Sequence, residues 1–182
     1  MTTADYSGAF DPEFSLDKLS RETLLKLLKA YTEYMLRIDG HWYLTVMGKW
    51  GNAEAFDCDV KVWEKAQVYE LKSMTSLLNI RGDDVATVMK AIQASPWMGI
   101  YEYKIDLKNN DHAVATYFKC PTLMALEKEG TGREALICRH MEPKLMGIIA
   151  HYFNPNITVT PLEVPPRTYD DCCCQWEFRL ER

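Results

Sequence analysis

The spacing of apolar residues changes along this 182-residue chain, and those changes constrain its fold more than any other feature. Up to about residue 95, apolar residues recur three or four positions apart, as on one face of a helix. Between 100 and 118 they alternate with polar residues, as in a half-buried strand. Helical spacing returns after Pro121, and alternation returns near the C-terminus. This order predicts an α+β fold, in which an antiparallel sheet packs against helices.

Capping residues set the boundaries of the predicted helices. A first helix is predicted from Ser20 to a cap at Gly51, and a second over 54–79. A short third helix is predicted over 84–94, ending before Pro96. The first helix carries a long apolar stripe at helical spacing, namely Leu24, Leu28, Tyr31, Met35, Ile38, Trp42 and Val46.

The rest of the chain is predicted to supply the sheet and further helices. Strand 100–107, a turn at 108–111 and a strand with Val114, Thr116 and Phe118 alternating predict a hairpin. Helices over 121–130, 133–141 and 144–153 follow, with a kink or break at Pro143, and then strands near 157–164 and 172–180. We expect a single domain over 15–182, after a flexible arm at 1–14. Its antiparallel sheet of about four strands should pack against an N-terminal helical layer and C-terminal helices.

Charge and hydropathy exclude several classes of partner. The chain has 21 basic and 26 acidic side chains, a net charge of −5, which is untypical of a nucleic-acid-binding protein. The first residues do not have the pattern of a signal peptide, and we expect no membrane span because no apolar run is long enough. We therefore expect a cytoplasmic protein that binds a small-molecule ligand. An apolar stripe on one of the aromatic-rich helices is consistent with a homodimer, and the sequence does not indicate which helix supplies it.

Six cysteines are the unusual part of the composition, and Cys172, Cys173 and Cys174 are consecutive. Cytoplasmic thiols stay reduced, so the six are not expected to form a disulfide framework. Alternation in the last strand predicts that Cys172 and Cys174 face inward and that Cys173 faces outward. Cys174 is then either a small core residue or a ligand.

Two other cysteines lie in settings that favour chemistry. Cys120 directly precedes Pro121 and a helix, where the helix N-terminus should lower the thiol pKa. It is therefore a candidate catalytic nucleophile or metal ligand, or else a cap without chemistry. Cys138, His140 and Glu142 are candidate ligands for zinc or iron, although neither CxxC nor HExxH is present.

Polar and aromatic residues elsewhere offer further candidates. Asp39 and His41 could perform acid–base catalysis, or they could be exposed helix residues. Arg133 at a helix start could hold a substrate carboxylate, or it could be a surface arginine. The aromatic content suits a ligand pocket that includes Trp42, Trp63 and Trp176, and equally suits a plain core.

Several of these segments together resemble a known family. They are Ile38-Asp39-Gly40-His41-Trp42-Tyr43, Gly51, Val62-Trp63, Cys120-Pro121, Gly132-Arg133, Cys138, Glu142 and Cys174-x-Trp176-x-Phe178. The pattern is similar to that of an uncharacterised family of prokaryotic cytosolic proteins common in anaerobes. More distantly it resembles the L-2-amino-thiazoline-4-carboxylate hydrolases and the vinyl-reductase-type ligand-binding domains. The second resemblance implies a zinc site at Cys138 and Cys174, with Cys120 as a third position, although here the closing cysteines are adjacent.

Three hypotheses follow. The first is a small-molecule enzyme, a hydrolase or lyase, with a cysteine-centred metal or thiolate site beside an aromatic pocket. The second is a non-catalytic small-molecule-binding or sensor module, with a structural metal or none. In the third, the cysteines are core residues and the function lies in protein partners.

Overall fold

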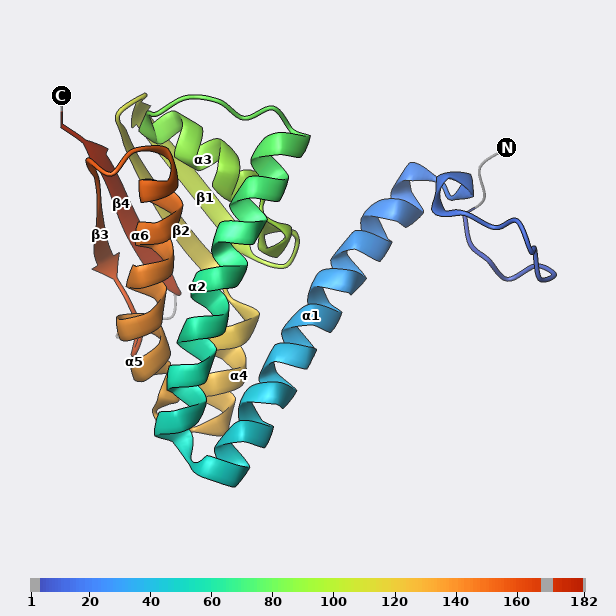
Figure 1. Ribbon diagram of the computed structural model, residues 1–182, viewed down its shortest axis with the longest axis horizontal. Helices are drawn as coiled ribbons and strands as arrows, with labels where there is room; N and C mark the ends of the chain where they lie inside the picture. The colour runs from blue at the N-terminus through green and yellow to red at the C-terminus, as the bar shows by residue number, and fades with distance from the viewer. Residues whose placement is uncertain (1–3, 168–171, 182) are drawn as a thin grey trace.

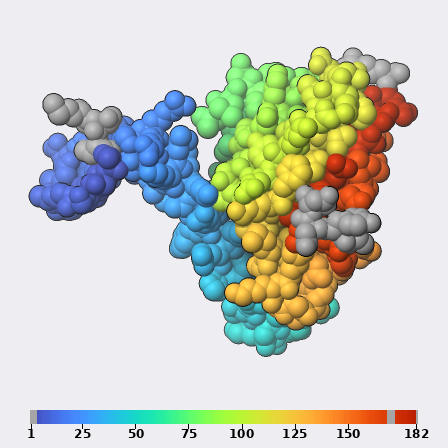
Figure 2. Space-filling view, turned by 180° about the vertical axis from the view of Figure 1, so that it is seen from behind, coloured from blue at the N-terminus to red at the C-terminus, as the bar shows by residue number. Residues whose placement is uncertain are grey.

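A four-stranded antiparallel sheet in the order β1-β2-β4-β3 forms one layer of the molecule. The computed structural model describes residues 4–167 and 172–181. Helices α2, α3 and α6 cover one face of the sheet (Figure 1), and the strands lie at the surface when the molecule is seen from behind (Figure 2). The predicted α+β class is confirmed.

The elements follow the predicted order closely. The helices are α1 Arg21–Trp50, α2 Asn52–Leu77, α3 Val85–Ala94, α4 Pro121–Glu129, α5 Arg133–Leu136 and α6 Glu142–Phe153, with short 3-10 turns at Leu16–Lys18 and Pro96–Gly99. The strands are β1 Glu102–Asn109, β2 His112–Lys119, β3 Ile157–Glu163 and β4 Cys174–Leu180.

Helix α1 has the caps that the sequence predicts, whereas α3 begins one residue later than predicted. The Ser20 hydroxyl accepts the N–H of Thr23 at the start of α1, and Gly51 ends the helix with φ at 88°. Asp84 caps α3 by accepting the N–H of Thr87 at 2.8 Å. Helices α1 and α2 therefore meet at Gly51, where the chain reverses direction (Figure 1).

The predicted break at Pro143 takes a specific form. A π-helical turn at Ile137–Met141 joins α5 to α6, and Pro143 lies in the first turn of α6. Proline is tolerated there because its missing N–H would have no partner within the helix. Wide turns of this kind re-aim side chains and are frequent at functional sites. Here the turn carries Cys138, and Glu142 follows it directly.

Small and aromatic side chains of the sheet fill the core. The β2 residues that face the helices are Ala113, Ala115 and Tyr117, whereas Phe118 is exposed. The alanines leave room for α3 to lie against β2. Trp176 and Phe178 of β4 are fully buried beside them.

The cysteine triple departs from the predicted alternation. Strand β4 begins at Cys174, so the strand period does not extend back to the two preceding cysteines. Cys173, expected to face outward, is buried, and its thiol donates to the carbonyl of Phe118 at 3.2 Å. The thiol of Cys172 donates to the carbonyl of Tyr117 at 3.7 Å. Backbone carbonyls of the neighbouring strand therefore orient these two thiols.

The N-terminal segment folds locally beside the start of α1. The rings of Tyr6 and Phe14 stack with centroids 4.0 Å apart, and Lys18 pairs with Asp11 at 2.8 Å. Within residues 4–167 and 172–181, no helix combines the length and hydrophobicity that a bilayer span requires.

Candidate functional site

A cavity of about 110 Å³ lies between helices α1, α2, α3 and α6 and the sheet. Four aromatic side chains line it, Trp63, Trp97, Tyr101 and Tyr117. Three carboxyl groups line it as well, Asp39, Glu70 and Glu142. The indole rings of Trp63 and Trp97 meet edge to face, with centroids 5.2 Å apart. Sites for small organic ligands typically have this kind of lining, largely aromatic with a few polar groups.

A second cavity, of about 60 Å³, adjoins the first. The two share Tyr101, Tyr117, Thr122, Glu142 and Met146, so they form neighbouring compartments of one hollow. The cysteines of three different elements meet in the second compartment, namely Cys120, Cys138 and Cys174, and Cys173 joins them. The tertiary structure therefore brings together the three thiols that the sequence singled out.

Glu142 stands between the two compartments. Burial raises the pKa of its carboxyl to about 7. None of the described side chains forms a hydrogen bond or ion pair with this carboxyl. A carboxyl group with this pKa is partly protonated at neutral pH, so it can both donate and accept a proton.

Asp39 and Asp59 form a pair of carboxyl groups between α1 and α2. The Trp63 indole N–H donates to Asp39 at 3.1 Å, and burial raises the pKa of Asp39. Asp59 is 3% exposed, and one of its carboxyl oxygens has no hydrogen-bond partner among the described residues. Burial, together with the nearby charge of Asp39, raises the pKa of Asp59 to about 7.

The thiols are protonated at neutral pH. Cys120 caps α4, since the N–H of Leu123 donates to its sulfur at 3.4 Å. The prediction that the helix N-terminus lowers its pKa is nevertheless wrong, because burial raises the pKa of Cys120 to about 11. Burial and the nearby Glu142 likewise raise the thiol pKa values of Cys138 and Cys174 well above their usual range. Desolvation outweighs the helix end because a single α-helical N-terminus contributes only a fraction of a charge.

The indole of Trp176 forms part of the wall beside these thiols. It is 1% exposed, and its N–H has no hydrogen-bond acceptor among the described residues. The N–H nevertheless lies near enough to the Cys174 sulfur to favour the thiolate there. A buried donor without an acceptor is costly, so a bound molecule with an acceptor atom would be stabilised at this position.

The potential metal ligands are not arranged around a common point. Among residues 4–167 and 172–181, no group of three or more His, Cys, Asp or Glu side chains is placed to hold a metal ion. His140 is exposed, whereas Cys138 and Glu142 face the cavities. In these positions the donors do not fit a three-ligand zinc or iron site. A zinc or iron site stays a prediction.

Comparison with known proteins identifies the family. The chain belongs to DUF6125. This family of unknown function matches residues 17–180, a stretch that holds both compartments and the carboxyl pair. The expectation of an uncharacterised family is therefore confirmed. No curated protein and no solved structure matches the chain.

In this DUF6125 protein the other predicted site residues divide into two groups. Asp39, Trp63 and Trp176 line the cavities, as described above. His41 and Trp42 are exposed on α1, and His41 lies two residues from Asp39, a spacing that places them on different helix faces.

Arg133 has intramolecular partners. It forms an ion pair with Glu129, and its guanidinium lies 4.7 Å from the ring centroid of Tyr43. The expected substrate carboxylate would have to compete with Glu129 for this arginine. Arg133 lines a groove between α1 and α4, together with Tyr43 and Asp59. This groove adjoins the first compartment, because the two share Leu36, Asp39, Thr122 and Met141.

Sequence reasoning missed two carboxyl groups, Asp59 in the groove beside Arg133 and Glu70 in the first compartment. Asp59 lies one helical turn before Trp63, a spacing that could have signalled a carboxyl beside the indole. Glu70 accepts a 3.2 Å hydrogen bond from the indole N–H of Trp97, and burial raises its pKa. No sequence signal pointed to that pair, because its members lie on different elements.

Proposed function

We propose that this protein is a small-molecule enzyme, a hydrolase or lyase, whose substrate occupies the two joined compartments. The observation that carries the proposal is the Glu142 carboxyl, which borders both compartments, has no cationic partner among the described residues and has a pKa raised to about 7. General acid–base catalysis is most effective when the pKa of the group lies near the working pH. Glu142 would take a proton from water or from the substrate and return it to the leaving group.

The lining favours a particular class of substrate. The described wall of the first compartment contains carboxyl and aromatic groups, and Lys, Arg and His are absent from it. Such a wall favours a compact molecule that has an apolar body and an amine, amidine or amide N–H group. In the second compartment, the Trp176 N–H would donate a hydrogen bond to an acceptor atom of the same molecule.

Tyrosines and thiols would complete the site as neutral groups. Burial raises the pKa values of Tyr101 and Tyr117, so their hydroxyls stay protonated and can donate to a substrate. The protonated thiols would form a soft, weakly polar wall, and the nucleophile would be water. The resemblance to L-2-amino-thiazoline-4-carboxylate hydrolases supports the hydrolase alternative. The cytoplasmic location proposed with this function would keep the thiols reduced.

The test begins with binding. A panel of small aromatic amines, amidines and amides would be titrated against the protein, with tryptophan fluorescence of Trp63 and Trp97 as the readout. Wild type and Glu142→Gln should both bind members of the panel, since Gln preserves the size of the side chain. Failure of the whole panel to bind the wild type would contradict the proposal.

Turnover separates the enzyme from the sensor alternative. Hydrolysis or elimination of the bound compounds would be followed by mass spectrometry in wild type, Glu142→Gln and Glu134→Gln. Glu134 is a matched control, because one of its oxygens is buried without a partner in the described structure although it lines neither compartment. Activity should be lost only in Glu142→Gln, and kcat/KM should depend on a pKa near 7. Binding without turnover would support the non-catalytic module instead.

Metal analysis tests the zinc or iron prediction separately. Protein purified without oxygen would be analysed for bound zinc and iron, with Cys138→Ser as the comparison. If the wild type contains one zinc or iron ion per chain and Cys138→Ser does not, the metal hypothesis is supported. The side chains that bind the ion must then lie closer together in the metal-bound protein than they do here.

A further inference from the structure

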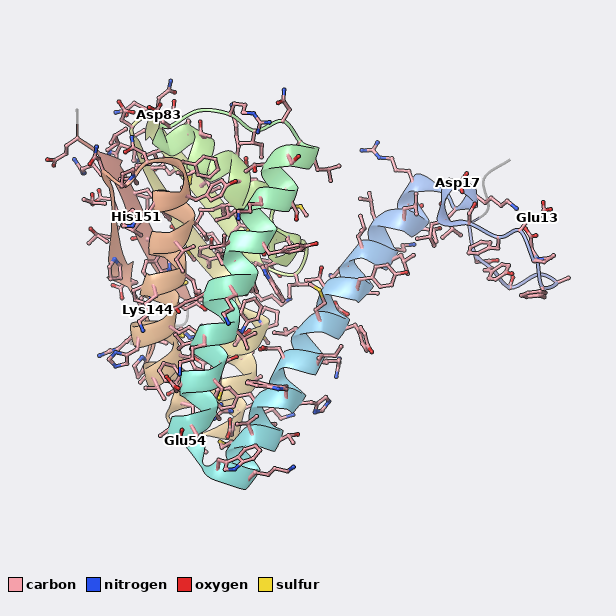
Figure 3. The ribbon with its side chains drawn as sticks, in the orientation of Figure 1. Glu13, Asp17, Glu54, Asp83, Lys144 and His151 are labelled. Carbon is pink, nitrogen blue, oxygen red and sulfur yellow. The ribbon has the colours of Figure 1, made fainter. Side chains whose placement is uncertain are left out.

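The first half of α1 stands away from the rest of the molecule. Helices α1 and α2 meet at Gly51 and diverge, so the N-terminal end of α1 lies far from the sheet (Figure 1). From behind, the N-terminal loop and the start of α1 form a separate lobe (Figure 2). Figure 3 places Glu13 and Asp17 in this lobe, remote from the labelled residues of α6.

One face of α1 packs against the rest of the protein. Thr32 is buried and donates its hydroxyl to the carbonyl of Pro96 at 3.2 Å. Leu36 and Asp39 line the first compartment, and Tyr43 is buried beside α2. These four residues are spaced three or four apart, so the contact with the body uses a single stripe of the helix.

A second stripe of α1 is apolar and exposed to solvent in the part of the chain that the structure describes. We call it the α1 seam and define it as Leu24, Leu28, Tyr31, Met35, Ile38 and Trp42. The spacing alternates between four and three residues, which is the heptad pattern of helices that pack against another helix. The last five seam residues are between 38% and 60% exposed.

The residues around the α1 seam complete the heptad pattern. Leu25, Leu27 and Tyr34 flank the seam and broaden its apolar face. The charged residues Lys26, Lys29, Glu33 and Arg37 occupy the outer heptad positions. This distribution is typical of a helix that buries one side against a partner and leaves the other side in water.

We propose that the α1 seam packs against the α1 seam of a second copy of this chain, forming a two-fold symmetric dimer. The exposed apolar side chains of the seam and its flanks present on the order of 800 Å², about what each partner of a standard-size interface buries. That area exceeds the few hundred Å² of contiguous apolar surface that monomers usually expose. An apolar seam can pair with its own copy, as a two-fold interface requires.

The test is the mass of the full-length protein in solution, measured by sedimentation or light scattering at about 50 μM, because dimer formation depends on concentration. Wild type should have twice the monomer mass of 21.1 kDa. The double variant Leu28→Glu, Met35→Glu should be monomeric, with its far-UV circular dichroism unchanged. Leu77→Glu is the matched control, since Leu77 is 76% exposed on α2 and lies outside the seam; it should remain dimeric.

A second variant covers the case in which the charged pair disturbs α1. The double variant Tyr31→Ala, Met35→Ala introduces alanine, which favours the helix, and removes two large seam side chains. It should raise the dimer dissociation constant at least about tenfold. A monomeric wild type, an assembly larger than two, or a dimer that survives both seam variants would overturn the proposal.

Discussion

The indole Nε1 of Trp63 on α2 donates a 3.1 Å hydrogen bond to Oδ1 of Asp39 on α1. This bond ties the two long helices together at the wall of the first compartment. The same indole also lowers the pKa of Asp59, whose carboxyl lies one turn before it on α2. Among the described residues, one carboxyl oxygen of Asp59 has no hydrogen-bond partner. The charge of Asp39 raises the pKa of Asp59, so the proton affinities of the two carboxyl groups are coupled.

Asp39→Asn should lower the pKa of Asp59. The variant removes the Asp39 charge that helps to raise the Asp59 pKa to about 7, while its amide oxygen can still accept from Trp63. A decrease of roughly one pH unit is expected. Carbon-detected NMR titration of the Asp59 carboxyl in both proteins measures it. In the control Asp57→Asn, which alters an exposed ion pair with Lys61, the Asp59 pKa should stay unchanged.

Trp63→Phe should destabilise the protein by about 1–3 kcal/mol, since a partly buried hydrogen bond to a carboxyl group is lost. Equilibrium urea unfolding at neutral pH measures the change. Trp50→Phe, at a position that is 64% exposed at the end of α1, should change the unfolding free energy by less than about 0.5 kcal/mol. Equal effects of the two substitutions would show that the Trp63–Asp39 bond contributes nothing.

Stability should fall as the pH rises between about 4 and 7. The pKa of Asp59 is about 7 in the folded protein, against 3.8 for an unperturbed carboxyl, so the folded state binds more protons in this interval. The stabilisation is fully present below pH 3.8, the pKa of Asp59 in the unfolded chain, and it is lost as the pH rises through about 7, the pKa of Asp59 in the folded protein. It amounts to a few kcal/mol, because a tenfold change in proton affinity is worth about 1.4 kcal/mol.

Urea unfolding at a series of pH values tests this dependence. Asp59→Asn should flatten the pH profile, because Asn does not ionise, and Glu142→Gln should flatten it further, since the pKa of Glu142 is also about 7. A wild-type free energy of unfolding that increased from pH 4 to pH 7 would contradict the raised pKa values.

Alkylation should distinguish the cavity thiols from the surface thiol. With iodoacetamide near pH 7.5, Cys120 should react more than about a hundredfold more slowly than a free thiol, because burial raises its pKa to about 11. The exposed Cys58 should be modified first. Peptide mass spectrometry over time gives each rate. Reaction at Cys120 ahead of Cys58 would restore the low-pKa nucleophile that the helix N-terminus suggested.

Predictions from local pattern agree with the structure wherever the cause was local. Ser20 and Gly51 were identifiable because a cap is formed by residues adjacent in sequence. The strand pattern predicted the wrong orientation for Cys173. Pairing of β4 with β2 starts only at Cys174, and the Cys173 thiol is buried where it donates to the carbonyl of Phe118. The prediction of the Cys120 pKa was wrong because burial is set by residues distant in sequence.

Local patterns in the amino-acid sequence were sufficient to predict the α+β class, the order of most elements, and Asp39, Trp63, Glu142 and Trp176 as candidate site residues. Hydrophobic periodicity and capping act over a few residues, so they can be recognised without knowledge of the fold. Long-range packing, in contrast, places Cys120, Cys138 and Cys174 in one compartment with Glu142 and keeps their thiols neutral there. Proximity and desolvation arise when α4, the π-helical turn and β4 pack together, and no local pattern encodes either of them.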